Sequence, residues 1–293
     1  MKNIILYIFV IAFLCTHAYA EDKFGDPSFE MGSRLVELIP GDQNYPIYVA
    51  DPRRPRTHAG IGYIDSDIPE ISNSIVNLDA GTRFTLLKMH KGSESANTFS
   101  LDIEGGLFAR FDLVNSFDNI GWDGRFGAYI NWERYGPVVI RFGYRHLSSH
   151  VGDEYVKKTG RRRINYDRDD LRIGLGYRFA NNALVYVEPS YAFHLGNTSR
   201  QDNPAVEGGI QYQGPYKMWK GSTGLYTGLH VSSYDENGWN PSISGQLGLK
   251  IKRDPEKIKL RVGFEGYVGR AIIGEYALDY DESYLTVGFS VEY

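Results

Sequence analysis

The sequence predicts an all-β protein, a transmembrane antiparallel β-barrel of about twelve strands. Three features carry this prediction: segments that alternate apolar with polar residues or glycine, connections that alternate between short and long, and a last strand that ends in an aromatic residue. After residue 20, no stretch approaches the roughly 18 apolar residues that a membrane helix needs. Strands are therefore the remaining way for this chain to cross a membrane.

The first twenty residues predict export. Lys2 is followed by an apolar run from Ile4 to Cys15, and the small residues Ala18 and Ala20 precede Glu21, which is the layout of a secretory signal peptide. We expect residues 1–20 to be removed and the mature chain to begin at Glu21. The only cysteine leaves with the signal, so the exported protein cannot use disulfides. The expected location is the outer membrane of a Gram-negative-type bacterium.

Residues 21–57 are rich in proline and lack the alternation of the segments that follow. An even number of strands puts both ends of a barrel on the periplasmic side. We therefore expect residues 21–57 to be a periplasmic N-terminal extension or a plug, and residues 58–293 to be the barrel.

Twelve alternating segments follow from His58, and the clearest span residues 99–113, 170–179 and 258–268. A water-soluble sandwich would show the same alternation, so the connections between the segments decide more. Tight turns are expected at 134–137, 181–182 and 253–256, and longer polar connections at 148–169, 196–204, 233–241 and 270–282. Connections 91–97 and 213–221 are longer than this scheme expects. Short turns on one side and long loops on the other are typical of outer-membrane barrels.

The last segment, "YLTVGFSVEY" at 284–293, alternates to the final residue. Leu285, Val287, Phe289 and Tyr293 share one face. A terminal strand of this kind resembles the signal by which outer-membrane barrels are recognised for insertion, which implies the barrel-assembly machinery as a partner.

The charged residues of the strands predict which side chains line the inside of the barrel. Lys and Arg number 32 against 36 Asp and Glu, a balance that gives no reason to expect nucleic acid as a partner. By parity, charged residues of both signs line the lumen, among them Asp102, Glu104, Arg110, Arg125, Glu133, Arg141, Arg145, Arg172, Arg178 and Glu188. Such a lumen is expected to be tied shut by ion pairs, with a narrow pore as the alternative. His194 and His230 also have lumen-facing parity.

Two segments of the chain carry a family resemblance. Ala50-Asp51-Pro52-Arg53 and the segment that runs from Ser149-His150 to Asp153-Glu154-Tyr155 resemble an uncharacterised family of predicted outer-membrane proteins. The resemblance covers nearly all of the mature chain and implies a barrel, but it implies no activity.

The strand that begins at Val138 predicts an outward-facing polar pair. Its even-numbered residues are apolar up to Tyr144, after which His146 and Ser148 continue the same face. They follow the preceding turn by about the height of a transmembrane strand, so we expect them at the outer leaflet boundary. On the next strand, Asp169 and Asp167 have outward parity. Counting back from the turn puts Asp169 nearest in height to His146, and a shift of register by a strand shear would make Asp167 nearly as good.

An outward His-x-Ser at this height is similar to the arrangement in the outer-membrane phospholipase A and lipid A deacylase families. The resemblance implies Ser148 as nucleophile, His146 as base and Asp169 or Asp167 as the group that orients the base. The alternative is that His146 joins the aromatic girdle while Ser148 begins the loop. The sequence thus predicts a structural, lipid-binding or narrow-pore barrel, or alternatively a serine lipid acyl hydrolase without a cofactor.

The following loop carries a dense set of cations, namely Lys157, Lys158, Arg161, Arg162 and Arg163. Phosphorylated lipid head groups, including those of lipopolysaccharide, are the expected partners, with an ordinary solvated loop as the alternative. No metal site is expected. On an extended chain His146 and His150 are about 13 Å apart, which is too far for shared coordination unless the loop folds back.

Overall fold

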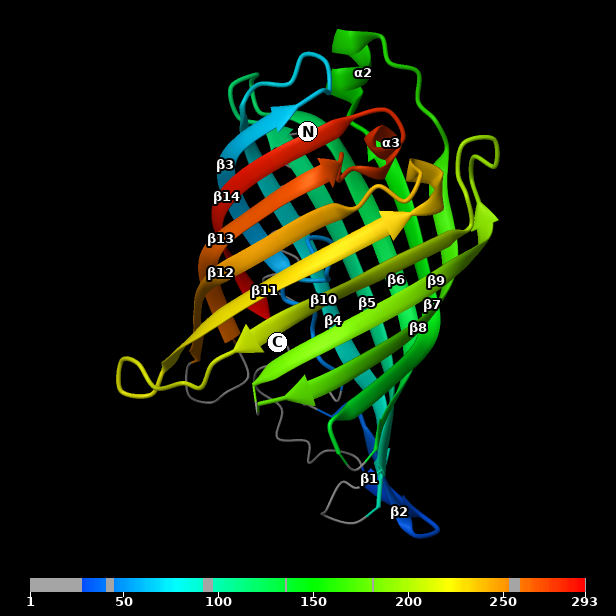
Figure 1. Ribbon diagram of the computed structural model, residues 1–293, viewed down its shortest axis with the longest axis vertical. Coiled ribbons are helices and arrows are strands. Elements are labelled where there is room, and N and C mark those ends of the chain that lie inside the picture. The colour runs from blue at the N-terminus through cyan, green and yellow to red at the C-terminus, as the bar shows by residue number, and fades with distance from the viewer. Residues whose placement is uncertain are drawn as a thin grey trace.

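The computed structural model describes residues 28–40, 45–91, 97–134, 136–180, 182–252 and 259–292. Twelve strands form a closed antiparallel barrel. Figure 1 shows the cylinder from the side. Strand β3 closes the cylinder by pairing with β14 on one side and β4 on the other. The barrel strands are β3 (Thr57–Ser66), β4 (Ser74–His90), β5 (Asn97–Asp112), β6 (Asp118–Arg134), β7 (Val138–Val151), β8 (Tyr166–Phe179), β9 (Ala183–Leu195), β10 (Pro204–Gln213), β11 (Thr223–Tyr234), β12 (Ser242–Lys252), β13 (Lys259–Arg270) and β14 (Asp281–Glu292). The predicted fold class and strand number are confirmed.

Closure of the cylinder satisfies the backbone. Each strand pairs with a neighbour on both sides, so the N–H and C=O groups of the wall find partners without water, as a hydrocarbon surrounding requires. Among the described residues, no helix is long and apolar enough to cross a membrane.

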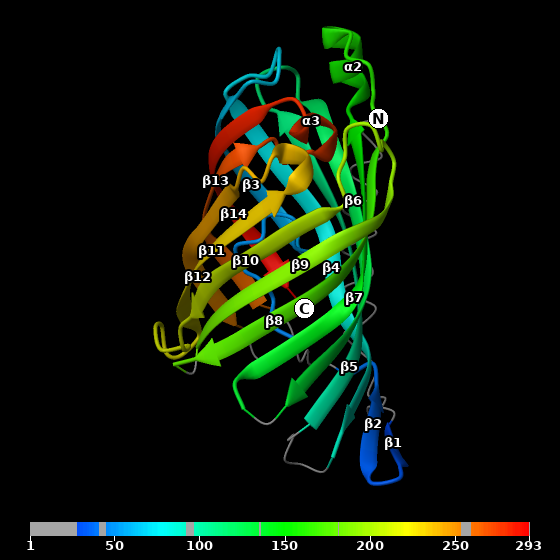
Figure 2. The same cartoon turned by 45° about the vertical axis from the view of Figure 1, so that its right-hand side comes forward.

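The connections divide the barrel into two ends. At one end, called the loop end here, lie the connections after β3, β5, β7, β9, β11 and β13, with α2 (Asp153–Thr159), the 3₁₀ turn η1 (Asp235–Asn237) and α3 (Gly274–Ala277). Figure 2 shows α2 standing above this end. The opposite end, called the turn end, carries the hairpin of β1 (Ser28–Met31) and β2 (Arg34–Leu38), which pairs with the last residues of β4.

The outer and inner faces differ as the parity of the strands predicts. Large apolar side chains are exposed on the outer wall, among them Ile130, Phe142, Ile173, Leu229, Leu247, Phe264, Leu285 and Phe289. Their strand neighbours point inward and are polar or glycine, which is the pattern of a wall between hydrocarbon and a polar interior.

Buried ion pairs tie the inner face of the wall together. Arg172 Nη2 lies 2.8 Å from Glu207 Oε2 and its Nε donates to Glu188. Arg145 bridges Glu207 at 3.0 Å and Asp170 at 2.9 Å. These pairs link side chains of the neighbouring strands β7, β8, β9 and β10 along the inner face of the wall. Arg145, Arg172 and Glu188, which the sequence predicts to line the lumen, lie inside the barrel and form these ion pairs.

Residues 45–56, called the plug here, run through the lumen. Val49 N–H donates to Gln211 Oε1 of β10 at 2.8 Å and the Ala50 carbonyl accepts from Ser244 Oγ of β12 at 2.6 Å, so the plug backbone is hydrogen-bonded to the wall. Arg56 pairs with two buried carboxylates, Asp79 and Glu265. The sequence leaves undecided whether residues 21–57 form a periplasmic extension or a plug. Residues 45–56 lie inside the barrel.

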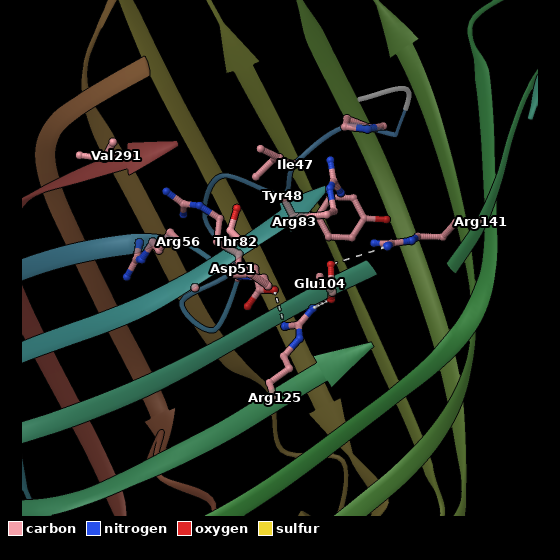
Figure 3. Close-up of a pocket in the computed structure, with 14 residues that line it drawn as sticks. Ile47, Tyr48, Asp51, Arg56, Thr82, Arg83, Glu104, Arg125, Arg141 and Val291 are labelled. Atoms are coloured by element: carbon pink, nitrogen blue, oxygen red, sulfur yellow. Dashed lines mark hydrogen bonds and ion pairs between the residues drawn. The ribbon is translucent and has the colours of Figure 1, made fainter. Parts of the chain in front are cut away.

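The plug leaves little free space. Figure 3 shows Arg125 of β6 between Asp51 of the plug and Glu104 of β5, at 3.2 Å and 2.7 Å. The cavities around the plug have volumes of about 30, 20 and 20 Å³. Each has room for only one or two water molecules. These small cavities surround a plug that is bonded to the wall, which does not favour an open channel through the described part of the lumen.

The loop end is capped by an apolar cluster. Ile272 and Ile273 pack with Tyr276 of α3, Tyr155 of α2 and Ile120 at the start of β6. Two side chains of the wall accept hydrogen bonds from the backbone of α3. Gly274 N–H donates to Asp123 and Glu275 N–H donates to Ser149. The loops thus close the barrel from above while the plug fills it from within.

Candidate functional site

The polar pair predicted on β7 lies on the outer face of the barrel, near the loop end. Burial alternates along β7, with Arg145, Leu147 and Ser149 buried in the interior while His146 and Ser148 lie partly exposed on the outer wall. The side chain of His146 keeps a quarter of its surface exposed. A lipid that surrounds the barrel would meet these two side chains directly.

A carboxylate on the neighbouring strand holds the histidine. His146 and Asp169 are direct partners in the pairing of β7 with β8, and His146 Nδ1 lies 2.8 Å from Asp169 Oδ1. Tyr144 donates a hydrogen bond from its hydroxyl to the same oxygen at 2.5 Å. The ring of Phe126, from β6, stacks on the imidazole with centroids 4.8 Å apart. Asp169 and Phe126 therefore hold the ring from two directions, and Tyr144 holds the carboxylate. Nδ1 is engaged by Asp169, while Nε2 has no hydrogen-bond partner among the described residues.

Ser148 lies two residues beyond His146 on the same face, about 7 Å away along the strand. Its cross-strand partners are Gly124 of β6 and Asp167 of β8. A Cβ at Gly124 would lie 3.3 Å from Ser148 Oγ, so the glycine leaves the wall open beside the hydroxyl. No hydrogen bond joins His146 and Ser148 among the described residues. Catalytic hydrogen bonds of this kind are often long without substrate and tighten in its complex.

The second candidate carboxylate has a different partner. Asp167 Oδ1 lies 3.3 Å from His194 Nε2 of β9, whose side chain is 60% exposed. The register of β8 with β9 shifts between Asp169 and Asp170, and the bulge brings both Phe193 and His194 to the outer face. The prediction that His194 faces the lumen is therefore wrong, because parity changes at a bulge.

Sequence reasoning missed three contributors to this site. Tyr144, Phe126 and Gly124 are ordinary residues of an outward strand face, and only the register of three strands shows that they surround the histidine and the serine. His230 does face the lumen as expected, where its Nδ1 lies 2.9 Å from the Tyr186 hydroxyl.

The five predicted basic residues do not form one patch. Lys158, Arg161 and Arg162 line one cleft at the loop end. Lys157 is exposed on α2, and Arg163 pairs with Asp153 beside α2. In the part of the chain that the structure describes, no group of three histidine, cysteine or carboxylate side chains is placed to hold a metal ion.

Solved structures share this architecture. Outer membrane phospholipase A from Escherichia coli is 13% identical over 85% of this chain and 94% of that chain, with a TM-score of 0.53. The Salmonella typhi outer membrane phospholipase dimer is 14% identical over 85% and 94%, with a TM-score of 0.52. At these identities the likeness concerns the fold. No curated protein matches the chain in sequence.

The resemblance carried by the segments around Asp51 and His150 is confirmed at the level of the family. A family model described as "Protein of unknown function (DUF1207)" matches residues 34–293, which is most of the chain, so the chain belongs to this family.

Proposed function

We propose that this protein is an outer-membrane serine hydrolase that cleaves acyl esters of lipids at the outer face of its barrel. One observation carries the proposal: on the outer face of the barrel, Asp169 holds His146 through Nδ1, and Ser148 lies two residues away on the same face. A nucleophile, a base and a group that orients the base are the three parts of this chemistry.

The residues divide the reaction between them. Ser148 Oγ attacks the ester carbonyl while His146 Nε2 accepts the hydroxyl proton, and Asp169 stabilises the imidazolium that forms. The C–O bond of the ester breaks as His146 returns the proton to the leaving alcohol. Water then attacks the acyl-serine with His146 again as base, which releases the fatty acid and restores Ser148.

The surroundings suit a lipid substrate. Exposed apolar side chains continue down the wall below the site, including Phe142 on β7 and Leu171 and Ile173 on β8, where acyl chains can lie. We infer that the loop end faces outward from the cell, which would put Ser148 near the boundary of the outer leaflet, where the ester bonds of lipids are found.

The similarity to outer membrane phospholipase A supports this proposal, because those enzymes act on phospholipids, as their name states, and share the barrel. A narrow pore is the weaker alternative, because the plug and the buried ion pairs leave cavities of only about 20 to 30 Å³.

Fatty acid release from phospholipid in mixed detergent micelles tests the proposal. The wild-type barrel should release fatty acid, and Ser148→Ala and His146→Ala should not. Ser190→Ala is the matched control, because Ser190 lies in the lumen with its hydroxyl buried and without a hydrogen-bond partner among the described residues. Ser190→Ala should keep full activity. Equal release by the wild type and Ser148→Ala, with heat-modifiable migration showing that both are folded, would reject the assignment.

A further inference from the structure

We propose that a cleft between the loops at the loop end is a binding site for a phosphorylated head group. The cleft has a volume of about 480 Å³, within the range of small-molecule sites. Four connections build it, those after β3, β7, β9 and β13. It is by far larger than the cavities around the plug.

The lining carries an excess of positive charge. Four cationic side chains, Lys158, Arg161, Arg162 and Arg200, face two carboxylates, those of Glu70 and Asp279. Lys158, Arg162 and Arg200 are exposed, so an anion can reach them from solution. Lys158 donates to the Glu70 backbone carbonyl at 3.2 Å, which holds the amine at the rim without neutralising it.

Arg161 is held rigidly in this cleft. Its Nη2 donates to the Glu275 carbonyl at 2.6 Å and to Asp279 Oδ2 at 2.8 Å, and its guanidinium lies over the rings of Tyr276 and Tyr280 at 4.9 and 5.3 Å. Its Nε is buried and has no hydrogen-bond partner among the described residues. A guanidinium fixed in this way loses little conformational freedom when it binds an anion.

Asp279 joins two arginines from different loops. Arg200 Nη2 lies 2.6 Å from Asp279 Oδ1, opposite the bond from Arg161. One carboxylate thus holds two forked guanidinium groups side by side and leaves a net positive pair. Paired arginine forks match the oxygen geometry of a phosphoryl group.

The shared chemistry is a phosphomonoester, carried either by a membrane glycolipid or by a free phosphorylated sugar. Binding would not require hydrolysis at Ser148, so this site stands independently of the proposed enzyme activity. Its ligand is recognised by charge and by arginine geometry.

Binding is measured with the Ser148→Ala protein in detergent, so that no lipid is consumed. The probes are bisphosphorylated lipid A, the same lipid without its phosphates, and soluble glucosamine phosphate. The added changes are Arg162→Ala with Arg200→Ala, and the matched control is Lys217→Ala with Lys220→Ala, two exposed cations at the turn end.

We expect phosphorylated lipid A to bind at least tenfold more tightly than the dephosphorylated lipid, and this difference to disappear in the arginine variant but not in the lysine variant. Binding of lipid A alone assigns a membrane head group, and binding of glucosamine phosphate as well assigns a free phosphorylated sugar. Equal losses in both variants, or affinity that does not depend on phosphate, would overturn the proposal.

Discussion

Replacing Asp169 by alanine tests how the site is assembled. The change removes the acceptor that lies 2.8 Å from His146 Nδ1 and 2.5 Å from the Tyr144 hydroxyl, and it leaves Ser148 and the strand register untouched. His146 would lose both its orientation and the negative charge that stabilises its protonated form during the reaction.

The size of the effect follows from the geometry. An imidazolium and a carboxylate in hydrogen-bond contact have charge centres about 4 Å apart, and at an effective dielectric constant of about 20 their attraction is about 4 kcal/mol. Each ~1.36 kcal/mol lost from transition-state stabilisation slows the reaction tenfold. Asp169→Ala should therefore lower kcat about 10³-fold.

Initial rates of fatty acid release in mixed micelles give kcat and KM separately. KM should change little, because Asp169 orients the base and is not expected to hold the lipid. Asp169→Asn keeps an oxygen that can accept from Nδ1 and loses only the charge, so its rate should lie between those of Asp169→Ala and the wild type. Asp167→Ala is the matched control, since Asp167 has the same parity on β8 but pairs with His194.

A fall of less than about tenfold in kcat for Asp169→Ala would refute this reasoning. So would a larger loss in Asp167→Ala than in Asp169→Ala, since that result would make Asp167 the partner of His146.

Three further predictions concern the wall, the core and the lumen. Gly124→Val should lower kcat/KM about 10²-fold, because even a Cβ there would lie 3.3 Å from Ser148 Oγ. Unchanged fatty acid release would contradict the idea that the wall must stay open beside the nucleophile. Arg56→Met should lower the free energy of unfolding by about 3–5 kcal/mol, because it leaves Asp79 and Glu265 buried without their cation. Urea titration in lipid vesicles measures this change, and a loss of less than about 1 kcal/mol would count against a buried pair. Planar bilayer recordings should show no stepwise conductance, and steps from the folded wild type would mean that the plug leaves the lumen.

Most of the fold follows from the sequence because parity is a local property of a strand. The direction of His146 and Ser148 can be derived from the apolar residues that precede them, without knowledge of any neighbouring strand. The alternation of turns and loops supplies the order of the strands around the cylinder.

The choice between Asp169 and Asp167 required the structure. A long connection with α2 separates β7 from β8, and nothing local in it sets which residue lies opposite His146. The direction predicted for His194 is wrong for a related reason. The bulge in β9 reverses parity after Ala192, and the sequence pattern does not reveal it.

The plug and the basic cleft depend on contacts between distant segments. Arg56 finds Glu265 more than two hundred residues along the chain, and Arg200 meets Asp279 from another loop. Charge composition predicts that side chains of opposite charge will pair, but only the folded barrel decides which of them meet.

The most direct test of the central claim is covalent capture of the nucleophile. The folded barrel in mixed micelles is treated with a lipid-like fluorophosphonate, and the modified peptide is found by mass spectrometry. We expect one adduct, on Ser148, that requires His146 and is lost in His146→Ala. A folded barrel that gives no adduct, or an adduct on another serine that persists in His146→Ala, would contradict it.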